Sequence, residues 1–459
     1  MKVELLDSTI REGEQSPNVS FNVNQKIEIV KSVDSFGVDF IELGHPAVSP
    51  DVWEAIDQIS NIKTRAKKLI HGRATKSDIN DASTFNVEWI GIFFGTSDLS
   101  LKHKFGNLSN EKALNHIKES IYYAKSKNFK LRFTAEDATR TNEIFLIEVA
   151  KCAQASGADR FSIADTVGVL TPESTKKLIT TIKKEIDIPI HIHCHNDFGL
   201  ATSNALSALL AGAQTVDVTV NGLGERSGIP PLAEICLALK EIYKVNNDWD
   251  LKNLYKLSNK IEKMSGIFNS ENRPIVGKNA FTHKAGLHSR AVLKNPKTYE
   301  SFPPEIIGRD RYITIDKYSG QDALKSRLKE LKIIVNEEDL KKILIEIKSQ
   351  PEKRKINDLE LLEIADEILK SNIKIYIPTE VEAIVNMELD NAIYTTRITR
   401  WLMSLSQLKD VYEVAGDYDI VAHIKAKSIK ELNSLIEEFR VKEGIKRTHT
   451  RPILKGYSN

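Results

Sequence analysis

The sequence predicts an α/β fold: a (β/α)8 TIM barrel, then a mainly helical connecting region, then a ferredoxin-like βαββαβ domain. Three observations predict it. Short β-rich runs alternate with amphipathic stretches over roughly the first 245 residues, close to the usual size of such a barrel. The chain becomes helical and highly charged after Lys244, and a βαββαβ order follows Ile377. We therefore expect a catalytic barrel at residues 1–265, connecting subdomains at 266–376 and a ligand-sensing domain at 377–459.

The expected barrel strands are short runs rich in β-branched and aromatic residues. They are Val3–Ser8, Asp39–Leu43, Lys68–Arg73, Trp89–Phe94, Leu131–Ala135, Arg160–Ala164, Ile188–His195 and Thr215–Val220. The expected helices between them are Asn24–Phe36, Glu111–Lys127, Glu143–Ala155, Pro172–Ile186 and Leu200–Ala211, with stop glycines at Gly37, Gly157 and Gly212. The alternative is an open, doubly wound sheet. Such a sheet usually has a glycine-rich phosphate turn after its first strand, and residues 7–14 do not form one.

The remainder of the chain follows different patterns. Leu251–Met264 is expected to be a helix, and residues 320–375 are expected to be helical with no obvious strand. The last segment is expected to contain a strand, a helix, a strand–turn–strand unit, a helix and an extended segment. Their ranges are Val381–Leu389, Thr395–Leu408, Val411–Lys425, Ser428–Glu438 and Ile445–Leu454.

Composition excludes several classes of function. Lys and Arg number 65 and Asp and Glu 63, for a net charge of +2, which gives no reason to expect a nucleic-acid partner. No apolar run approaches the ~18 residues of a membrane span, and acidic residues interrupt the start where a signal peptide would be apolar. The three cysteines are far apart, which is typical of reduced thiols. We therefore expect a cytoplasmic protein with no membrane contact.

Polar residues mark one end of nearly every expected barrel strand. They are Asp7 to Gln15, Glu42 and His45, His71 and Arg73, Arg132, Thr134 and Glu136, Asp165 and Thr166, His193 to Asp197, and Asn221. Catalytic residues of (β/α)8 barrels lie at the carboxyl ends of the strands. A purely structural barrel does not need this pattern, so we expect an active site there.

The histidine run at residues 191–195 is the strongest local signal. His191, His193 and His195 alternate with other residues and so share one face of a strand, while Cys194 points the other way and is expected to be a buried small hydrophobe. The two histidines nearest the strand end, with Glu12, form a set of two imidazoles and one carboxylate that suits a divalent cation. The alternative for the histidines is a polar barrel layer.

Two further features belong to the same expected mouth. Arg11 precedes Glu12 and would stabilise a developing alkoxide or enolate, the alternative being a surface salt bridge. The loop after the eighth strand contains Gly222, Gly224 and Arg226. Loops in this position often hold phosphate, so a nucleotide-bearing cofactor is expected to bind there.

Three motifs carry a resemblance to a known family. Residues 7–15, 191–199 and 221–228 resemble the signatures of the 2-isopropylmalate synthase/homocitrate synthase family, which are metal-dependent barrel enzymes that condense acetyl-CoA with a 2-oxo acid. The resemblance covers roughly residues 1–320. Within the family, residues 11–15, 132–137, 163–168 and 281–288 resemble homocitrate synthases. Isopropylmalate synthases more often have Arg-Asp-Gly in the first motif and lack the arginine equivalent to Arg132.

The resemblance implies condensation of acetyl-CoA with 2-oxoglutarate to (R)-homocitrate and CoA, the first step of lysine biosynthesis by the aminoadipate pathway. Arg132 and Thr134 suit the distal carboxylate of that substrate, whereas a 2-oxoisovalerate pocket would be apolar there. The chain departs from the family at Gly44–Pro46, where many homocitrate synthases have a Ser-Pro-type turn, and at Gly91, where other members carry an acid. Isopropylmalate or citramalate synthesis therefore stays open as an alternative.

The resemblance also implies roles for single residues. Glu12, His193 and His195 would bind Mg, Mn or Zn. The expected catalytic residues are Arg11, Glu136, His288 and Tyr299, and the expected substrate-binding residues are Arg11, His71, Arg132, Thr134 and Thr166. His288 and Tyr299 lie in a segment that reaches a neighbouring subunit in the family, which implies a homodimer. We further expect Arg11 and Arg132 to be unpaired cations, reserved for a dianionic substrate.

The last 80 or so residues resemble the RAM domain, the small-molecule-binding domain of leucine-responsive regulators. The resemblance rests on the βαββαβ order and on Gly416, Asp417, Tyr418 and Asp419. It implies an amino-acid effector, with lysine expected, bound at those four residues. The alternative is a dimerisation module without a ligand. A different class, an amino-acid-sensing regulator on a degenerate barrel, is disfavoured by the intact set of site residues and by the missing DNA-binding helix pair.

Overall fold

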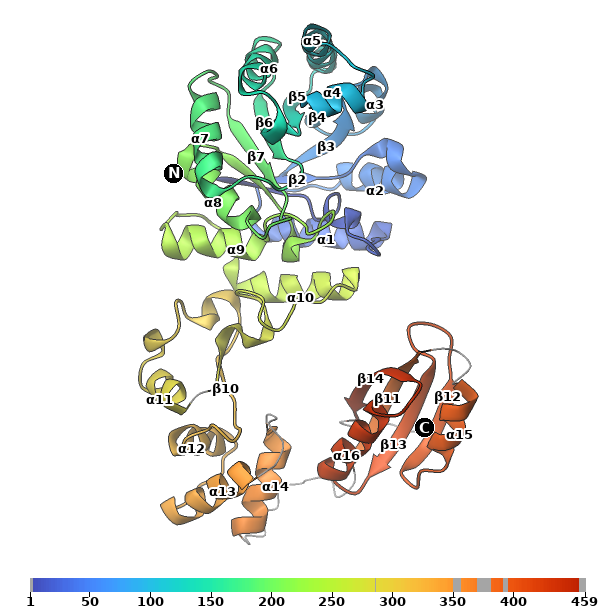
Figure 1. The fold of residues 1–459 in the computed structure, drawn as a ribbon, viewed down its shortest axis with the longest axis vertical. Helices are drawn as coiled ribbons and strands as arrows, with labels where there is room; N and C mark the ends of the chain where they lie inside the picture. The colour runs from blue at the N-terminus through green and yellow to red at the C-terminus, as the bar shows by residue number, and fades with distance from the viewer. Residues whose placement is uncertain (1–2, 285, 350–355, 370–380, 391–394, 454–459) are drawn as a thin grey trace. The chain divides into compact units, whose positions relative to one another are not determined.

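The computed structural model describes residues 3–284, 286–349, 356–369, 381–390 and 395–453. The chain forms two compact units, one of residues 1–282 and 300–311 and the other of residues 283–299 and 312–459. The first unit contains a closed barrel of parallel strands, which lie inside a ring of helices (Figure 1). The strands are β1 (Glu4–Asp7), β2 (Phe40–Glu42), β3 (Lys67–Arg73), β4 (Trp89–Gly95), β5 (Lys130–Glu136), β6 (Arg160–Asp165), β7 (Ile190–Cys194) and β8 (Thr215–Val218).

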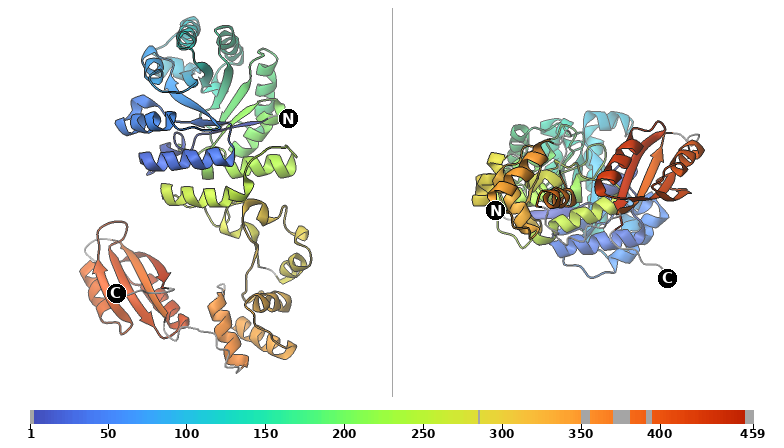
Figure 2. Two further views of the ribbon diagram at one scale, coloured as in Figure 1. Left: turned by 180° about the vertical axis from the view of Figure 1, so that it is seen from behind. Right: turned by 90° about the horizontal axis from the view of Figure 1, so that it is seen from below.

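The barrel closes because β8 pairs in parallel with β1, with Glu4 opposite Thr215. The eight predicted strands are all confirmed, and the alternative of an open sheet is wrong. The helices of this unit are α1 (Val23–Phe36), α2 (Pro50–Ser60), α3 (Lys76–Ala82), α4 (Asp98–His103), α5 (Asn110–Ser126), α6 (Glu143–Ala155), α7 (Pro172–Lys183), α8 (Ala201–Ala211), α9 (Leu232–Leu237) and α10 (Leu254–Ser265). Seen from behind, the same strands again lie within the helices (Figure 2, left).

Local sequence explains where these helices begin and end. The side chains of Asn22 and Gln25 form a capping box that starts α1, and Gly37 ends it in the left-handed region at φ +106°. Thr75 and Ser97 cap the short helices α3 and α4 through their side-chain oxygens. The expected helices do not include α2, α3, α4 or α9.

The interior of the barrel is layered. Leu6, Phe40, Leu69 and Trp89 form a separate buried apolar cluster, and the rings of Phe40 and Trp89 meet edge to face at 5.2 Å. Arg160, at the start of β6, stacks over both rings. Apolar packing therefore fills the amino-terminal end of the barrel, so the polar residues at the carboxyl ends of the strands face the other mouth.

The second unit contains helices and a four-stranded antiparallel sheet. Its first helices are α11 (Gly286–Lys294), α12 (Gln321–Glu330), α13 (Glu337–Ser349) and α14 (Asp358–Leu369). Two short strands, β9 (Thr282–His283) and β10 (Tyr312–Ile313), pair with each other in a sheet of their own. The helical prediction for residues 320–375 is confirmed within the described ranges, with residues 350–355 and 370–375 outside them.

The C-terminal elements are β11 (Val381–Leu389), α15 (Thr395–Met403), β12 (Leu408–Glu413), β13 (Ile420–Ala426), α16 (Ile429–Arg440) and β14 (Ile445–Pro452). The sheet order β12-β13-β11-β14 confirms the βαββαβ prediction. The predicted helix Thr395–Leu408 was too long, because the helix ends at Met403 and Leu408 already pairs with Ile424 on β13. The expected boundary at Ile377 and the strand end at Leu454 lie outside the described residues. No helix among the described residues is long and apolar enough to cross a membrane.

Candidate active site

Three predicted metal ligands meet at the carboxyl-terminal mouth of the barrel. Glu12 follows β1, His193 lies on β7 and His195 follows it, and one ligand atom from each lies within 4.8 Å of the others. The Nε2 atoms of His193 and His195 are 3.2 Å apart. Among the residues that the structure describes, this is the one cluster of such donors.

Asp217 on β8 orients this cluster. Its Oδ2 lies 2.7 Å from Nδ1 of His193, and its Oδ1 lies 2.6 Å from Nε2 of His191. An ionised carboxylate only accepts, so Nδ1 of His193 donates and Nε2 keeps its lone pair for a ligand. His191 is thereby held away from the cluster. Cys194 is fully buried, as expected.

The protonation states suit a divalent cation. Burial raises the pKa of Glu12, but Arg11, His193 and His195 lower it further, so the net pKa lies below its ordinary value and the group is ionised. Burial and the neighbouring His193 lower the pKa of His195 to about 4, so its ring is neutral at pH 7. A carboxylate and two imidazoles with open positions form a donor set that fits Mg, Mn or Zn.

Glu42 on β2 is a site residue to which sequence reasoning gave no role. It is fully buried, and its carboxylate accepts hydrogen bonds from Ser8 Oγ at 2.6 Å, Arg11 Nε at 2.7 Å and Arg132 Nη2 at 2.7 Å. His71 Nδ1 lies 3.2 Å away. Burial raises the pKa of Glu42, but Arg11, Arg132 and His71 together hold it well below its usual range.

The expectation that Arg11 and Arg132 are unpaired cations is therefore wrong. Arg132 is nevertheless only partly satisfied: its Nε and Nη1, and Oγ1 of Thr134, are buried and have no hydrogen-bond partner among the described residues. Nη1 lies 3.9 Å from Asp217 Oδ1, beyond hydrogen-bonding distance. Unsatisfied buried donors are costly, so these three atoms mark a place where an anionic group fits.

Gly91 on β4 makes room for the Arg132 side chain. An ideal Cβ at Gly91 would lie 2.7 Å from Nη2 of Arg132 and 3.0 Å from its Cζ and Nε. The guanidinium therefore lies against the bare backbone of β4. The absence of a side chain at Gly91 therefore admits the arginine in this orientation.

The remaining predicted residues lie around this centre. His71 stacks on Phe93 at 4.8 Å, and burial lowers its pKa to about 4. The Thr166 hydroxyl accepts a hydrogen bond from the Asp137 backbone. Glu136 pairs with Lys104 at 2.8 Å rather than with the metal cluster.

His288 and Tyr299 belong to the second compact unit. Their rings are in contact, with centroids 4.1 Å apart. Their catalytic role stays a prediction.

The glycine loop after β8 uses its amides inside the protein. Gly222 N donates to Thr219 O, Gly224 N donates to Ser16 Oγ at 2.7 Å, and Glu225 N donates to Glu12 Oε1 at 3.0 Å. Arg226 forms a two-point pair with Asp197. The loop lies against Glu12 through the amide of Glu225. The amides of Gly222 and Gly224 are already hydrogen-bonded within the protein. The phosphate-binding role of Gly222, Gly224 and Arg226 stays a prediction.

The predicted effector residues form the turn between β12 and β13. Asp419 Oδ2 accepts from Leu389 N at 2.8 Å, and Tyr418 Oη lies 3.1 Å from His449 Nδ1. Gly416 is left-handed at φ +138°, and Asp417 is exposed. Gly416 and Asp417 are thus accessible to a ligand, whereas Tyr418 is half-buried and Asp419 holds the neighbouring strand.

Family models match nearly the whole chain. The model described as HMGL-like matches residues 2–261, that described as Homocitrate synthase post-HMGL domain-like matches 275–355, and that described as Lrp/AsnC ligand binding domain matches 382–459. These ranges follow the order of the three expected segments. The boundaries at 265 and 376 stay predictions.

Known proteins agree with these matches. The protein named homocitrate synthase of Sulfurisphaera tokodaii is 45% identical over 465 residues, covering 99% of this chain and 100% of that protein. Its namesake from Saccharolobus solfataricus is 45% identical over 460 residues, covering 99% of each. The solved structure of Bacillus subtilis HMG-CoA lyase superposes with a TM-score of 0.52 at 20% identity, over 58% of this chain and 94% of that one, and supports the barrel fold alone. The chain belongs to the homocitrate synthase family, with an HMGL-like barrel and a C-terminal domain of the Lrp/AsnC ligand-binding type.

Proposed function

We propose that this enzyme condenses acetyl-CoA with 2-oxoglutarate to give homocitrate and CoA, with a divalent metal ion at Glu12, His193 and His195. The observation that carries the proposal is the set of unsatisfied buried donors on Arg132 and Thr134, held beside that metal-binding cluster. A dicarboxylic 2-oxo acid has a metal-chelating end and a second carboxylate that fits those donors. In the branched, uncharged side chain of 2-oxoisovalerate, nothing would satisfy them.

Each group of residues in the site has a separate role in the condensation. A bound Mg, Mn or Zn ion supplies Lewis-acid polarisation of the keto group. Arg132 and Thr134 bind the distal carboxylate, and His71 and Thr166 are further candidates for binding the substrate carboxylates. Arg11, clamped by Glu12 at 2.5 Å and by Glu42, stabilises the negative charge that develops on the keto oxygen. Glu136, His288 and Tyr299 are the candidates for removing the acetyl proton and for protonating the product.

The electron balance follows from these roles. Loss of a proton from the acetyl methyl group gives the enolate, whose carbon bonds to the keto carbon while the keto oxygen gains the electron pair and is protonated. Hydrolysis of the thioester then releases CoA as a thiol. That released thiol is the measurable product.

The test is thiol release from acetyl-CoA in the presence of 2-oxoglutarate, 2-oxoisovalerate or pyruvate, before and after removal of metal with EDTA. We expect turnover with 2-oxoglutarate, loss with EDTA and recovery on adding a divalent cation. An Arg132→Ala variant should lose its preference for 2-oxoglutarate, and Lys130→Ala, exposed on the same strand, is the matched control. Turnover with 2-oxoisovalerate or pyruvate alone would replace the substrate by that of an isopropylmalate or citramalate synthase.

We also propose that the C-terminal domain binds a free amino acid, lysine, at Gly416, Asp417, Tyr418 and Asp419, and that the enzyme is a cytoplasmic homodimer of the aminoadipate route. The Lrp/AsnC match and the accessible turn support the ligand. Calorimetric titration of the full chain with lysine, arginine and leucine tests it, since the absence of heat with all three would leave a dimerisation module. Light scattering on the same sample measures the mass of the assembly.

A further inference from the structure

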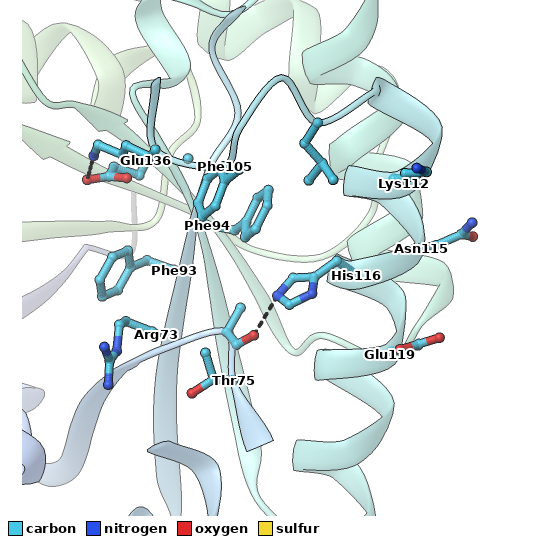
Figure 3. A pocket seen from close by; sticks show the side chains of 14 residues that line it. Arg73, Thr75, Phe93, Phe94, Phe105, Lys112, Asn115, His116, Glu119 and Glu136 are labelled. Atoms are coloured by element: carbon cyan, nitrogen blue, oxygen red, sulfur yellow. Dashed lines mark hydrogen bonds and ion pairs between the residues drawn. The ribbon is translucent and has the colours of Figure 1, made fainter. Parts of the chain in front are cut away.

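The proposed condensation gives no role to the glycine-rich loop after β8, residues 222–228. A cavity of about 740 Å³ lies elsewhere at the barrel mouth, at the ends of β3, β4 and β5, and Figure 3 shows Phe94 and Phe105 lining it. The described residues that line this cavity do not include residues 222–228. The loop instead contacts the metal-binding cluster and the two barrel loops beside it, which points to a role in that cluster.

One end of the loop lies directly against Glu12. The amide of Glu225 donates a hydrogen bond to Glu12 Oε1 at 3.0 Å. Gly224 is so close that an added Cβ would lie 3.0 Å from Glu12 Oε1 and 3.2 Å from Glu12 Cγ. From the other side, Ser16 Oγ accepts from Gly224 N at 2.7 Å and donates to Gly224 O at 3.0 Å. The bare backbone of Gly224 therefore packs on a proposed metal ligand and limits where its carboxylate can lie.

The other end of the loop is bonded to the segment that follows His195. Arg226 Nε donates to Asp197 Oδ1 at 2.7 Å, and Arg226 Nη2 donates to Asp197 Oδ2 at 2.9 Å. Asn196 N donates to Gly228 O at 2.9 Å. Residues 225–228 therefore connect two of the three proposed metal ligands, one after β1 and one after β7, through hydrogen bonds at both ends.

Arg226 makes these contacts from an unfavourable backbone conformation. Its φ is +55°, in the left-handed region that residues with a Cβ rarely adopt. Its Nη2 also donates to Thr166 O at 2.7 Å, so the guanidinium joins the loops after β6, β7 and β8. A strained residue persists only where the surrounding structure fixes it. The fold therefore specifies the position of this side chain.

We propose that Arg226 is a positioning residue for the metal site. Its pair with Asp197 fixes the loop, and the amide of Glu225 then holds the carboxylate of Glu12. The loop thereby sets the separation between Glu12 and His195 before the ion binds. This inference rests on the proposed function, in which those two residues bind the metal. Loss of the hydrogen-bonding groups that orient metal ligands typically lowers metal affinity about 10- to 100-fold.

A positioning role and a purely electrostatic role predict opposite effects on metal affinity. A hydrogen bond to Asp197 raises the pKa of Arg226, and the charge of Glu12 raises it further, so the guanidinium is close to the metal-binding groups. Removing a cation from this place would by charge alone strengthen the binding of a divalent cation. If Arg226 positions the loop, its removal weakens that binding instead.

The Mn²⁺ affinity of the full chain, measured by competitive chelator titration, tests the proposal without turnover. Arg226→Ala should weaken Mn²⁺ binding about tenfold. The melting temperature of the metal-free protein should stay nearly constant, since a partly exposed ion pair adds little stability. Arg226→Gly removes the same side chain but accepts the left-handed backbone without strain, and should show the same loss.

Arg140→Ala is the matched control. Arg140 also forms a two-point pair with a carboxylate, that of Asp137, but on the loop after β5. Its removal should leave the Mn²⁺ affinity unchanged. Arg226→Lys keeps the charge but lacks the two-point geometry, so it should retain only part of the affinity.

Two results would overturn the proposal. One is an Mn²⁺ affinity of Arg226→Ala equal to or higher than that of the unmodified enzyme. The other is unchanged Mn²⁺ affinity with weaker CoA binding in calorimetric titration at saturating Mn²⁺, which would return Arg226 to the nucleotide-binding role predicted from the sequence. If the variants lose Mn²⁺ affinity as expected but the unmodified enzyme condenses no 2-oxo acid, the proposed reaction fails and the positioning role stands.

Discussion

At the scale of single residues, the sequence predicts the metal ligands. It does not predict that the carboxylate of Glu42 pairs with Arg11 and Arg132. Glu12, His193 and His195 could be predicted because each lies at a strand end and the histidines alternate along β7. The sequence places Glu42 at the end of β2 but does not predict its role, because its partners Arg11 and Arg132 are distant from it in sequence. Pairing across a barrel interior depends on register and side-chain length, which local patterns do not contain.

Adding a single methyl group at Gly91 is expected to impair the binding of 2-oxoglutarate by Arg132. Gly91→Ala places a methyl group 2.7 Å from Nη2 of Arg132 and displaces the guanidinium. A misplacement of about 1 Å in a substrate-binding group can lower the reaction rate about 100-fold. We therefore expect kcat/KM for 2-oxoglutarate to fall about 10- to 100-fold. Gly72→Ala on β3, whose new methyl group would have the Asp78 side chain as its nearest neighbour at 3.3 Å, is the matched control. Unchanged kinetics in Gly91→Ala would show that Arg132 does not bind the substrate from this position.

Asp217 is expected to act on metal affinity through a histidine. Asp217→Asn leaves one carbonyl oxygen for two imidazoles, so His191 or His193 loses its acceptor and the ring of His193 is no longer held in one tautomer. Metal affinity measured by competitive chelator titration should fall about 10- to 100-fold. Glu12→Gln provides the reference for loss of a direct ligand, and thermal melting of the metal-free proteins checks that both variants fold. An affinity equal to that of the unmodified enzyme would contradict the positioning role.

At the scale of elements, the strands were easier to predict than the short helices. A parallel barrel strand is buried on both faces and appears as an apolar run between turns, so β1 to β8 agree with expectation within a few residues. The helices α3 and α4 have 7 and 6 residues, too few for an amphipathic pattern. Their capping residues Thr75 and Ser97 were the only local signal, and such residues also occur in ordinary turns.

The start of α3 provides a prediction about pH. Asp78 accepts from the Arg73 side chain and backbone and from the Thr75 hydroxyl, and lies 2.7 Å from His45 Nε2. Burial raises the pKa of Asp78, but these partners lower it well below its ordinary value. Asp78→Asn should therefore destabilise the barrel by about 2 kcal/mol at neutral pH.

A depressed carboxyl pKa stabilises the fold above the unfolded-state value, about 3.9, and that contribution disappears as the pH falls toward the folded-state pKa. The difference in melting temperature between the unmodified enzyme and Asp78→Asn should thus be constant from about pH 7 to about pH 5 and shrink below about pH 4. Asp81→Asn, on the same helix, is the control. A difference that grows on acidification would refute the assignment.

At the scale of the whole molecule, the order of the domains was predictable because each has its own periodicity and its own core. The barrel core, the core formed between Ile315 and Ala365, and the C-terminal core between Val381 and Ile445 are separate clusters of buried residues. The local sequence pattern of each segment therefore predicts its domain independently of the other two. Closure of the barrel by β8 on β1 is the long-range feature that only the count of strands implied.

Separate cores also imply that a substitution in the C-terminal turn can be used to test regulation without disturbing the catalytic core. Asp417 is exposed at the tip of the turn, so Asp417→Ala should not unfold the domain. If lysine binds there through its α-amino group, loss of the carboxylate should weaken both the calorimetric affinity for lysine and the inhibition of thiol release about tenfold. Glu438→Ala, exposed on α16 of the same domain, is the matched control. Lysine inhibition that persists unchanged in Asp417→Ala, and competes with 2-oxoglutarate, would locate the effector at the barrel mouth instead, where Arg132 and Thr134 already bind a carboxylate in the proposed reaction.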